Sequence, residues 1–453
     1  MHFSPRSRRS GPTARTSRRF ELPGFSAVAL GLLAACGEEG GAGPPAGGSA
    51  GMDSPDFAVA PEWESLWTVG ALDGEDWEVF GDVTDLVFNQ AGDLFVLDEQ
   101  AGHVVVFDRA GAHLRTISRQ GEGPGELTEP RSMALLADGR LAVFDRSRRG
   151  IQFFTQEGEY LESVPFDPQR GMPSFVRGWL PDGSILTNSE TRITSTADGG
   201  MSFSTNSGAA EAERPIIRYG PDGGRGVWYT AWDPPPPTGE GVSTEGAIQL
   251  TMRPVRAFDP SLSFVPLRDG RLAIVDSVDY RIKLVDEAGT VADVLERPVR
   301  PIPVTDAIRD AEREWRLDQL DGPGVRLSSP LGGSLPLPSG FQEQMTAARR
   351  TTIEQMQFAE AIPAIDDLAL DFEGRLWVER RGLPGEEGSI DIVTPDARYL
   401  GTIQSGGLRI PDAFGPDGLM AYGETHDLGF PIVRVVRLTP AVPLEAGSST
   451  EDP

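Results

Sequence analysis

Residues 263–289 read SFVPLRDGRLAIVDSVDYRIKLVDEAG, and degraded copies of this stretch can be laid over most of the chain. Its first two apolar runs flank a turn that ends at Gly270, a residue type that adopts positive φ at little cost. The second run lacks polar alternation, so both of its faces should be buried. The stretch predicts four short strands, at Phe264–Leu267, Leu272–Val275, Ile282–Val285 and Val291–Leu295.

The same pattern of a turn followed by an apolar run recurs along the chain. In each copy a turn ending in Gly stands two residues before the start or centre of an apolar run. The residues in that position are Leu94, Leu141, Ile185, Leu272, Leu376 and Met420. Their spacings are 47, 44, 87, 104 and 44 residues, and the shorter values are typical of four-stranded propeller blades. We therefore predict an all-β fold, a six-bladed β-propeller. Seven blades, with residues 230–262 as a degraded blade, is the alternative.

Ring closure and two insertions follow from the same pattern. The last blade lacks a fourth strand at the end of the chain, and an early apolar stretch at Leu66–Val69 should supply it, which leaves no open edge. Residues 233–260 open with four prolines and predict a loop. Residues 304–360 predict a helical insertion between blades 4 and 5.

Two helices are expected in this insertion. Thr305 is a candidate N-cap for the first, and a capping box at Ser339 opens the second. At helical spacing the first helix presents Ile308, Ala311 and Trp315, and the second presents Phe341, Met345, Ala348, Thr352 and Met356. These stripes predict packing of the insertion onto the propeller, with a lid over a binding site as the alternative.

The single cysteine, Cys36, has the context of a processing site. Six arginines and a short apolar run precede it, and the sequence Leu33-Ala34-Ala35 leads into the thiol. This arrangement resembles the lipobox of bacterial lipoproteins, in which the cysteine is lipidated. The expected organisation is a signal peptide over 1–35, a flexible tether over 36–56, the propeller over 57–440 and a disordered tail over 441–453.

The segments around Cys36 also bear on the cellular location of the protein. Ser17–Leu22 resembles a twin-arginine export signal, and general secretion is the alternative. Gly37 follows the cysteine, which in enterobacterial lipoproteins resembles a signal for the outer membrane. We expect a lipid-anchored protein of the bacterial cell envelope.

The charge balance limits the partners. Without residues 1–35 the chain carries 35 basic and 67 acidic residues. Binding of nucleic acids and of anionic lipid surfaces depends on basic patches. We therefore expect no nucleic-acid partner, and the membrane only through the N-terminal lipid.

Two further motifs carry a family resemblance. They are Gly121–Glu126 before the second blade and Phe358–Pro363 before Gly374-Arg375-Leu376-Trp377-Val378. With the repeated Asp-Gly turns, they resemble bacterial six-bladed propeller lipoproteins, relatives of the NHL-repeat and TolB-like propellers. Most members of this group have no assigned chemistry, so the resemblance implies a fold rather than an activity.

Some propellers that share this fold hold Ca²⁺ at the channel, as lactonases of the gluconolactonase and paraoxonase kind do. The matching positions here include Asp85, Asp367 and Asp412, and oxygen ligands of this type suit Ca²⁺. Arg177 in the same ring would oppose a cation. The alternative is that these carboxylates accept hydrogen bonds from loop amides or pair with Arg177.

A zinc site of the kind used by NHL-type amidating lyases would require histidines, and His103, His113 and His426 are available after processing. His103 and His426 belong to blades that would be neighbours in a closed ring, but no third ligand is evident. We expect no cofactor, with Ca²⁺ as the alternative.

Charged residues follow the second strand of several blades. An Asp in this position can accept hydrogen bonds from the amides of the next turn. The mixed charge of these connections favours recognition of a protein segment or a glycan over catalysis, and a Ca²⁺-dependent hydrolase is the alternative. The candidate binding residues are Asp98, His103, Asp145, Arg149, Arg177, Asp276, Arg281, Arg381 and His426.

Overall fold

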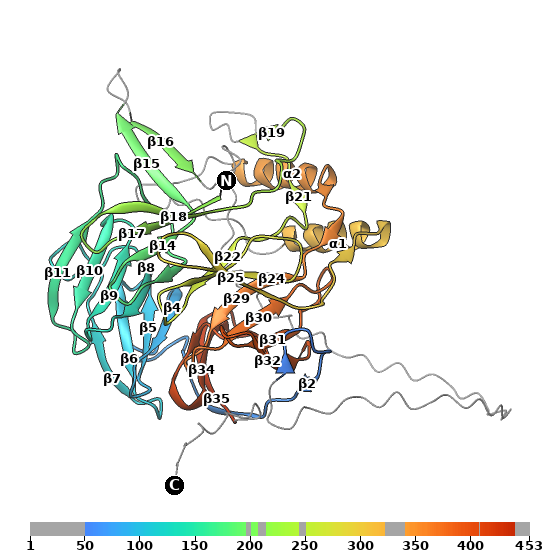
Figure 1. The fold of residues 1–453 in the computed structure, drawn as a ribbon. Coiled ribbons are helices and arrows are strands. Elements are labelled where there is room, and N and C mark those ends of the chain that lie inside the picture. The colour runs from blue at the N-terminus through green and yellow to red at the C-terminus, as the bar shows by residue number, and fades with distance from the viewer. Residues whose placement is uncertain are drawn as a thin grey trace, which may run out of the picture.

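The computed structural model describes residues 50–195, 201–206, 214–243, 251–321, 340–406 and 408–439. Within these residues, six sheets surround a common axis as the blades of a propeller, each with four antiparallel strands, and the sheet of blade 5 is extended by two short strands (Figure 1). The predicted fold class is confirmed, and the seven-bladed alternative is wrong. The proposed signal peptide, Cys36 and the C-terminal tail lie outside the described residues.

Blades 1, 2 and 4 are each built from four consecutive strands. Blade 1 contains β4 (Val83–Phe88), β5 (Leu94–Asp98), β6 (His103–Phe107) and β7 (His113–Ile117). Blade 2 contains β8 (Pro130–Leu135), β9 (Leu141–Asp145), β10 (Gly150–Phe154) and β11 (Tyr160–Pro165). Blade 4 contains β22 (Ser263–Pro266), β23 (Leu272–Val275), β24 (Arg281–Val285) and β25 (Val291–Glu296).

The other three blades are interrupted or extended. Blade 3 contains β13 (Gly178–Trp179), β14 (Ile185–Thr187), β17 (Arg214–Tyr219) and β18 (Arg225–Ala231). Blade 5 contains β29 (Ile365–Leu370), β30 (Leu376–Arg380), β31 (Ile390–Val393) and β32 (Arg398–Ile403). Blade 6 contains β33 (Ala413–Phe414), β34 (Leu419–Thr425) and β35 (Pro431–Leu438), with η2 (Pro416–Gly418) as its first turn.

The turn glycines behave as the repeat predicts. The six glycines of the first turns, from Gly92 to Gly418, have φ values between 74° and 88°. A side chain at these positions would be strained, so the backbone itself explains why the turn repeats. The second strands β5, β9 and β23 are buried throughout, as expected for strands covered on both faces.

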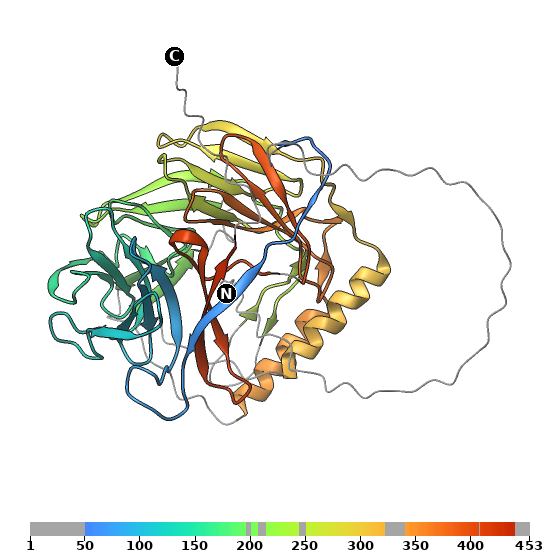
Figure 2. The ribbon, with the colours of Figure 1, turned by 90° about the horizontal axis from the view of Figure 1, so that it is seen from below.

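Strand β3 (Trp63–Val69) closes the ring as predicted. It pairs antiparallel with β35, so that Trp63 lies opposite Leu438 and Val69 opposite Val433. Figure 2 shows this N-terminal strand beside the C-terminal strands. The first and last parts of the propeller therefore share one sheet, and blade 6 has its fourth strand.

The core lies between the blades. In the described part of the chain, six apolar clusters each join residues of two neighbouring blades around the ring. The seam of blades 1 and 2, for example, buries Phe95, Val104 and Phe154. Because burial of one such side chain contributes about 1.5–3 kcal/mol, the seams hold the ring together.

The insertions add small strands and two helices. They contain β12 (Met172–Pro173), β15 (Glu190–Ser195), β16 (Met201–Asn206), β19 (Val242–Ser243), β20 (Thr251–Met252), β21 (Arg256–Ala257), β26 (Ile302–Pro303), β27 (Gln357–Phe358), β28 (Ala361–Ile362), α1 (Asp306–Asp318), η1 (Gln319–Asp321) and α2 (Phe341–Glu354). Strands β15 and β16 pair antiparallel where the sequence predicted a loop over 191–213, and β19, β20 and β21 are short strands within 233–260, where a loop was expected.

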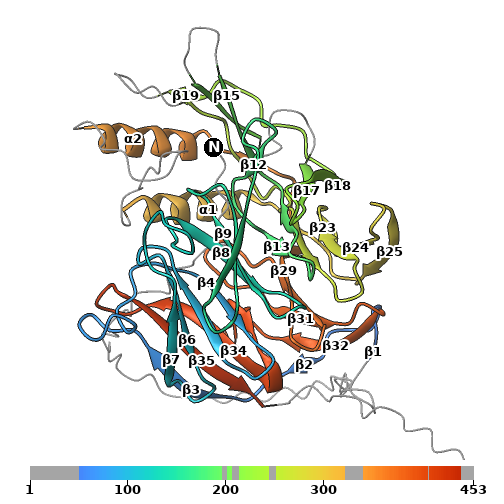
Figure 3. The ribbon, with the colours of Figure 1, turned by 90° about the vertical axis from the view of Figure 1, so that its left-hand side faces the viewer.

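The helical insertion is confirmed between blades 4 and 5 (Figure 3). Thr305 caps α1, and its side chain accepts a hydrogen bond from the amide of Ile308 at 3.4 Å. Helix α2 begins at Phe341 after Gly340, and the capping box predicted at Ser339 lies outside the described residues.

The packing stripe of α2 is confirmed, and that of α1 is only partly correct. Phe341, Ala348 and Met356 are buried, and Met356 shares an apolar cluster with Phe258 beneath the helices. In α1, Ile308 packs against the same cluster, but Ala311 is exposed and Trp315 is 39% exposed against Gly385.

The end of the predicted tether lies on blade 5. Strand β1 (Ala50–Gly51) pairs antiparallel with β32, and β2 (Ala58–Val59) pairs parallel with the same strand. Residues 50–56, which the sequence placed in a flexible segment, thus follow the outer edge of the propeller.

Candidate functional site

One face of the ring carries both the connections between blades and the links between second and third strands, because neighbouring strands run in opposite directions. We call it the insertion face. The strand pair β15–β16 and the described parts of the connections from blade 3 to blade 4 and from blade 4 to blade 5 all leave the blades on this face (Figures 1 and 3). Blades 1, 2 and 6 have shorter connections there.

Three predicted binding residues lie beneath this face. Asp98, Asp145 and Asp276 end the second strands of blades 1, 2 and 4, and all three are buried. The carboxylates of Asp98 and Asp145 accept hydrogen bonds from the segment that enters the same blade and from the turn after the second strand. The carboxylate of Asp276 accepts one from the residue that follows blade 3. The donors to Asp98 are the amides of Gly81, Asp82 and Ala101, and the donors to Asp145 are the amides of Thr128, Glu129 and Arg148. The amide of Trp232 donates to Asp276, and all of these distances are 2.7–3.2 Å.

The predicted arginines occupy separate places on the face. Arg281 pairs with Glu296 at 2.7 Å, and Arg381 pairs with Asp366 at 3.2 Å. Arg177 lies over the ring of Phe175. Arg149 has a φ of 56°, an uncommon conformation for a residue with a side chain, and is half-buried. The structure does not gather these four side chains into one cluster.

The histidines do not form a common site either. His103 begins β6, and burial lowers the pKa of its imidazole, although Asp98 and Asp76 act in the opposite direction. His426 stacks on Phe430, with 4.4 Å between the ring centroids. His113 stacks on Trp77 at 4.8 Å.

Two of the three predicted metal ligands connect neighbouring blades. The carboxylate of Asp85 in blade 1 accepts a hydrogen bond from the hydroxyl of Ser132 in blade 2 at 2.8 Å. Ser132 in turn accepts one from the indole of Trp179 in blade 3 at 2.9 Å. Asp367 in blade 5 accepts from the hydroxyl of Ser263 in blade 4 at 2.5 Å. These inner-strand contacts hold blades to one another.

Asp412 is engaged in a similar way within blade 6. Its carboxylate accepts a hydrogen bond from the amide of Gly423 at 2.8 Å and lies 3.4 Å from the guanidinium of Arg409. Among the described residues, no three His, Cys, Asp or Glu side chains converge as a metal-binding group. All three aspartates accept hydrogen bonds from backbone amides, as the first part of the alternative has it, and Asp85 and Asp367 also accept from serine hydroxyls.

A charged cluster lies where blades 1 and 2 meet the insertion face. We call Glu99, Glu129, Arg131 and Arg146 the blade 1–2 cluster. Arg131 contacts Glu99 at 2.7 Å and Glu129 at 2.6 Å, and Arg146 also contacts Glu129. Arg131 stands at a β-bulge in the inner strand β8, which gives the guanidinium its place between the two carboxylates.

The electrostatics of this cluster are unusual at Glu99. Burial raises the pKa of the Glu99 carboxyl to about 7, and the nearby charges of Asp82 and Glu129 act in the same direction, whereas Arg131 opposes them. A carboxyl that titrates near neutral pH marks a candidate functional site, although ion-pair networks in general perturb pKa values. The cluster can donate and accept hydrogen bonds to a polar ligand.

Exposed apolar side chains accompany the charges on the insertion face. Trp232 and Trp315 stand in the inserted segments, and Leu383 and Leu428 stand in the links between second and third strands of blades 5 and 6. Leu428 is 72% exposed beside the stacked pair of His426 and Phe430. Tryptophan is a common anchor in recognition surfaces.

The sequence identified this face but missed most of these residues. The sequence predicted charged residues after the second strands, but Glu99, Glu129, Arg131 and Arg146 are not among the predicted binding residues. Glu99 and Arg146 directly follow the buried aspartates Asp98 and Asp145, and that position was the available signal. The bulge at Arg131 has no local sequence signature.

The comparisons with known proteins agree with the fold. A family model described as "6-bladed beta-propeller" matches residues 71–170, which contain blades 1 and 2. The chain is a six-bladed β-propeller protein. No curated protein matches it.

Several solved propeller structures are similar to the chain. A member of the DUF4221 family from Bacteroides vulgatus has 10% identity and a TM-score of 0.45, covering 84% of this chain and 100% of that one. Virginiamycin B lyase from Staphylococcus aureus has 11% identity and a TM-score of 0.35, covering 83% and 100%. A gluconolactonase from Xanthomonas campestris has 14% identity and a TM-score of 0.34, covering 87% and 99%. At these values the matches do not bear on activity.

Proposed function

We propose that the protein is a non-enzymatic recognition module that binds a protein segment or a glycan on the insertion face. The observation that supports this most is the composition of the face. It combines a charged cluster with exposed apolar side chains, of which Trp232 and Leu428 are the most prominent. A mixed surface of this kind fits a polar ligand that also has an apolar part.

The buried aspartates support this role indirectly. Because Asp98 and Asp145 use their carboxylates on backbone amides, they fix the connections that carry Glu99 and Arg146. A binding surface held in one conformation loses less entropy when the ligand binds. The face is therefore preorganised by residues that need not touch the ligand.

A selection experiment tests the binding role. The probes are a phage-displayed library of random 12-residue peptides and a panel of bacterial envelope glycans, each presented to the full chain. We expect ligands whose affinity falls at least ten-fold in Trp232→Ala or Leu428→Ala. Leu114→Ala, at an exposed position on the outer strand β7, is the matched control and should change affinity less than two-fold. Ligands that respond only to the control, or no ligand at all, would contradict the proposal.

The alternative of a Ca²⁺-dependent hydrolase is tested separately. A cation that binds the native state at one hundred times its Kd stabilises it by about 2.7 kcal/mol, which is visible as a rise in melting temperature. We expect millimolar Ca²⁺ to leave the melting temperature of the metal-stripped protein unchanged. A rise that disappears in Asp85→Ala or Asp412→Ala would replace the binding role with a metal site.

We place this module in the bacterial cell envelope, anchored by a lipid on Cys36. The support is the run of arginines, apolar residues and small residues before that cysteine. In the described part of the chain, no helix has the length and apolar character needed to cross a membrane. Cys36→Ala should release the protein from the membrane fraction, and retention of this variant without lipid label would contradict the anchor.

A further inference from the structure

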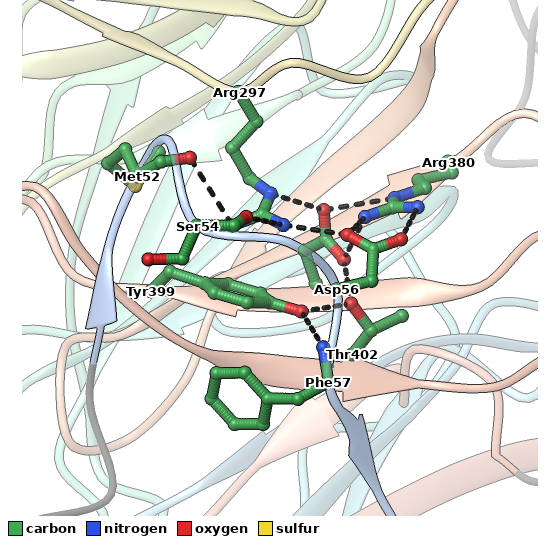
Figure 4. A network of polar contacts seen from close by, with 9 residues as sticks. Met52, Ser54, Asp56, Phe57, Arg297, Arg380, Tyr399 and Thr402 are labelled. Carbon is green, nitrogen blue, oxygen red and sulfur yellow. Dashed lines mark hydrogen bonds and ion pairs between the residues drawn. The ribbon is translucent and has the colours of Figure 1, made fainter. Parts of the chain in front are cut away.

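The N-terminal segment 50–59, which we call the strap, lies along the edge of blade 5. Ala50 and Gly51 pair with Tyr399 and Arg398, and Ala58 and Val59 pair with Thr402 and Ile403. Between these short strands the strap crosses the seam of blades 4 and 5. Figure 4 shows how its side chains meet the residues of that seam.

Asp56 is the main polar contact of the strap. Its carboxylate accepts two hydrogen bonds from the guanidinium of Arg380, both at 2.7 Å, and a third from Arg297 at 2.7 Å (Figure 4). Arg297 also donates to the carbonyl oxygens of Met52 and Ser54, at 3.5 and 3.3 Å. This two-point contact with Arg380 is the geometry by which arginine recognises carboxylates.

Phe57 adds an apolar contact next to the carboxylate. Its ring meets that of Tyr399 edge-on, with 4.9 Å between centroids, and its amide donates a hydrogen bond to the Tyr399 hydroxyl at 3.3 Å. The amide of Thr402 donates to the carbonyl of Phe57 at 3.0 Å. The strap therefore binds through main-chain contacts and two adjacent side chains.

The site beneath the strap is held in place by the propeller alone. Arg380 contacts the buried carboxylate of Asp391 at 2.8 Å, and Arg297 lies 3.4 Å from it. The Thr402 hydroxyl donates to Asp391 at 2.5 Å, and Arg297 lies over the ring of Tyr399. These contacts involve only blades 4 and 5, so the two arginines are positioned whether or not the strap is docked.

The charges of this site require a further anion. Arg297 and Arg380 together carry two positive charges, and Asp391 supplies one negative charge. With the strap docked, the Arg297 side chain is fully buried. An uncompensated buried charge is costly, so the site favours a second carboxylate. Asp56 supplies it in this structure.

The strap itself is weakly held. The side chain of Asp56 is 44% exposed, most of the segment faces solvent, and its two strands contain two residues each. Segments with few buried contacts open at low free energy while the rest of the fold stays intact. The binding residues of blades 4 and 5 are thus fixed in place, whereas the strap that occupies their site can detach.

We propose that the seam of blades 4 and 5 is a binding site for an extended peptide that carries a carboxylate followed by an aromatic residue. The chain's own strap fills this site, and an acidic segment of a partner protein takes its place. The peptide adds to the edge of β32 as a further strand, which is a recurring mode of peptide recognition. This inference is independent of the function proposed for the insertion face.

A peptide added in trans tests the site. The probe is a fluorescent peptide with the sequence of residues 50–59, AGMDSPDFAV, and its control replaces the second aspartate by asparagine. The protein is the full chain in two forms, wild type and the double variant D56N/F57A, which weakens its own strap without changing the arginines. Fluorescence anisotropy gives the affinities, and thermal melting confirms that the variant is folded.

The expected affinities follow from the covalent attachment of the strap to the propeller. A segment on a short linker competes at an effective concentration on the order of 1 mM, so a strap that docks in cis must bind in trans with a Kd below about 1 mM. We expect the double variant to bind the peptide with a Kd of about 0.1 mM or less, because only then does the docked strap weaken binding to the wild type about ten-fold. The asparagine peptide should bind the double variant at least ten-fold more weakly. Absence of binding at about 1 mM, equal affinity for both peptides, or equal affinity of both proteins would each overturn the proposal.

Discussion

The blade 1–2 cluster and the strap site contain the same number of charged side chains but differ in how these side chains contact one another. Each brings two arginines and two carboxylates together at a seam between neighbouring blades. In the blade 1–2 cluster, Glu99 contacts only Arg131, which it shares with Glu129, and burial raises its pKa to about 7. At the strap site, Asp56 contacts two arginines, and hydrogen bonds from Arg380 and Arg297 lower its pKa.

The difference shows that the count of charges does not determine the electrostatics of a buried cluster. The number of arginine contacts per carboxylate, and its access to solvent, decide the direction of the pKa shift. The origin of the residues also differs. The blade 1–2 cluster is built from adjacent blades, whereas Asp56 comes from a segment that can leave. We therefore expect one cluster to be fixed and the other to be exchangeable.

Removal of a buried arginine from the strap site should have the largest effect. Arg297→Ala leaves the buried Asp391 with less compensation and should lower the free energy of unfolding by about 3–5 kcal/mol. Denaturant unfolding measures this change. Arg281→Ala is the matched control, because its pair with Glu296 is exposed, and should cost less than about 1 kcal/mol. Equal effects of the two substitutions would show that the strap site is not a buried ion cluster.

A smaller loss is expected from the support of the blade 1–2 cluster. Asp145 is buried and accepts hydrogen bonds from the amides of Thr128, Glu129 and Arg148. Asp145→Ala leaves these donors without their acceptor and should lower the free energy of unfolding by about 2–3 kcal/mol. Asp138→Ala changes an exposed carboxylate in the first turn of the same blade and serves as the control. A loss confined to the control would refute the role of Asp145.

The pH dependence of stability should distinguish Glu99 from its neighbours. Its folded-state pKa of about 7 lies above the ordinary value of 4.5, so the folded protein holds this proton more tightly. Stability should therefore fall as pH rises from 4.5 through 7. Glu99→Gln should remove this slope and, since the side chain retains some solvent contact, stabilise the protein at pH 8 by about 1–2 kcal/mol.

Urea midpoints measured from pH 4.5 to 8 for both proteins test this prediction. The difference between wild type and Glu99→Gln isolates one carboxyl, because the lowered pKa of His103 contributes a slope of opposite sign to both. Parallel curves would mean that Glu99 titrates as an ordinary surface carboxyl.

The propeller was predictable because its signals are local. A turn glycine that needs positive φ, followed by an unbroken apolar run, recurs in every blade, and the structure shows φ near that of Gly270, 87°, at each such turn. The cap at Thr305 is local in the same sense. Trp315 was misassigned because helical spacing alone does not say which face of α1 meets the protein.

The two charged clusters could not be predicted in the same way. Asp56 lies 241 residues from Arg297 and 324 residues from Arg380, so no spacing in the sequence connects them. The raised pKa of Glu99 results from burial that exists only after blades 1 and 2 have packed. The predicted aspartates, by contrast, were found at the expected ends of strands but use their carboxylates on amides and hydroxyls.

Hydrogen exchange at the strap tests most directly whether this segment is a separable occupant of a permanent site. The amide of Thr402 donates to the carbonyl of Phe57, and that of Ile392 lies in the central ladder of the same blade. We expect Thr402 to exchange faster than Ile392, and Asp56→Asn to speed Thr402 exchange about ten-fold, a change of about 1.4 kcal/mol, while leaving Ile392 unchanged. Equal exchange of the two amides in the wild type, with no effect of Asp56→Asn, would show that the strap opens only when the whole propeller unfolds.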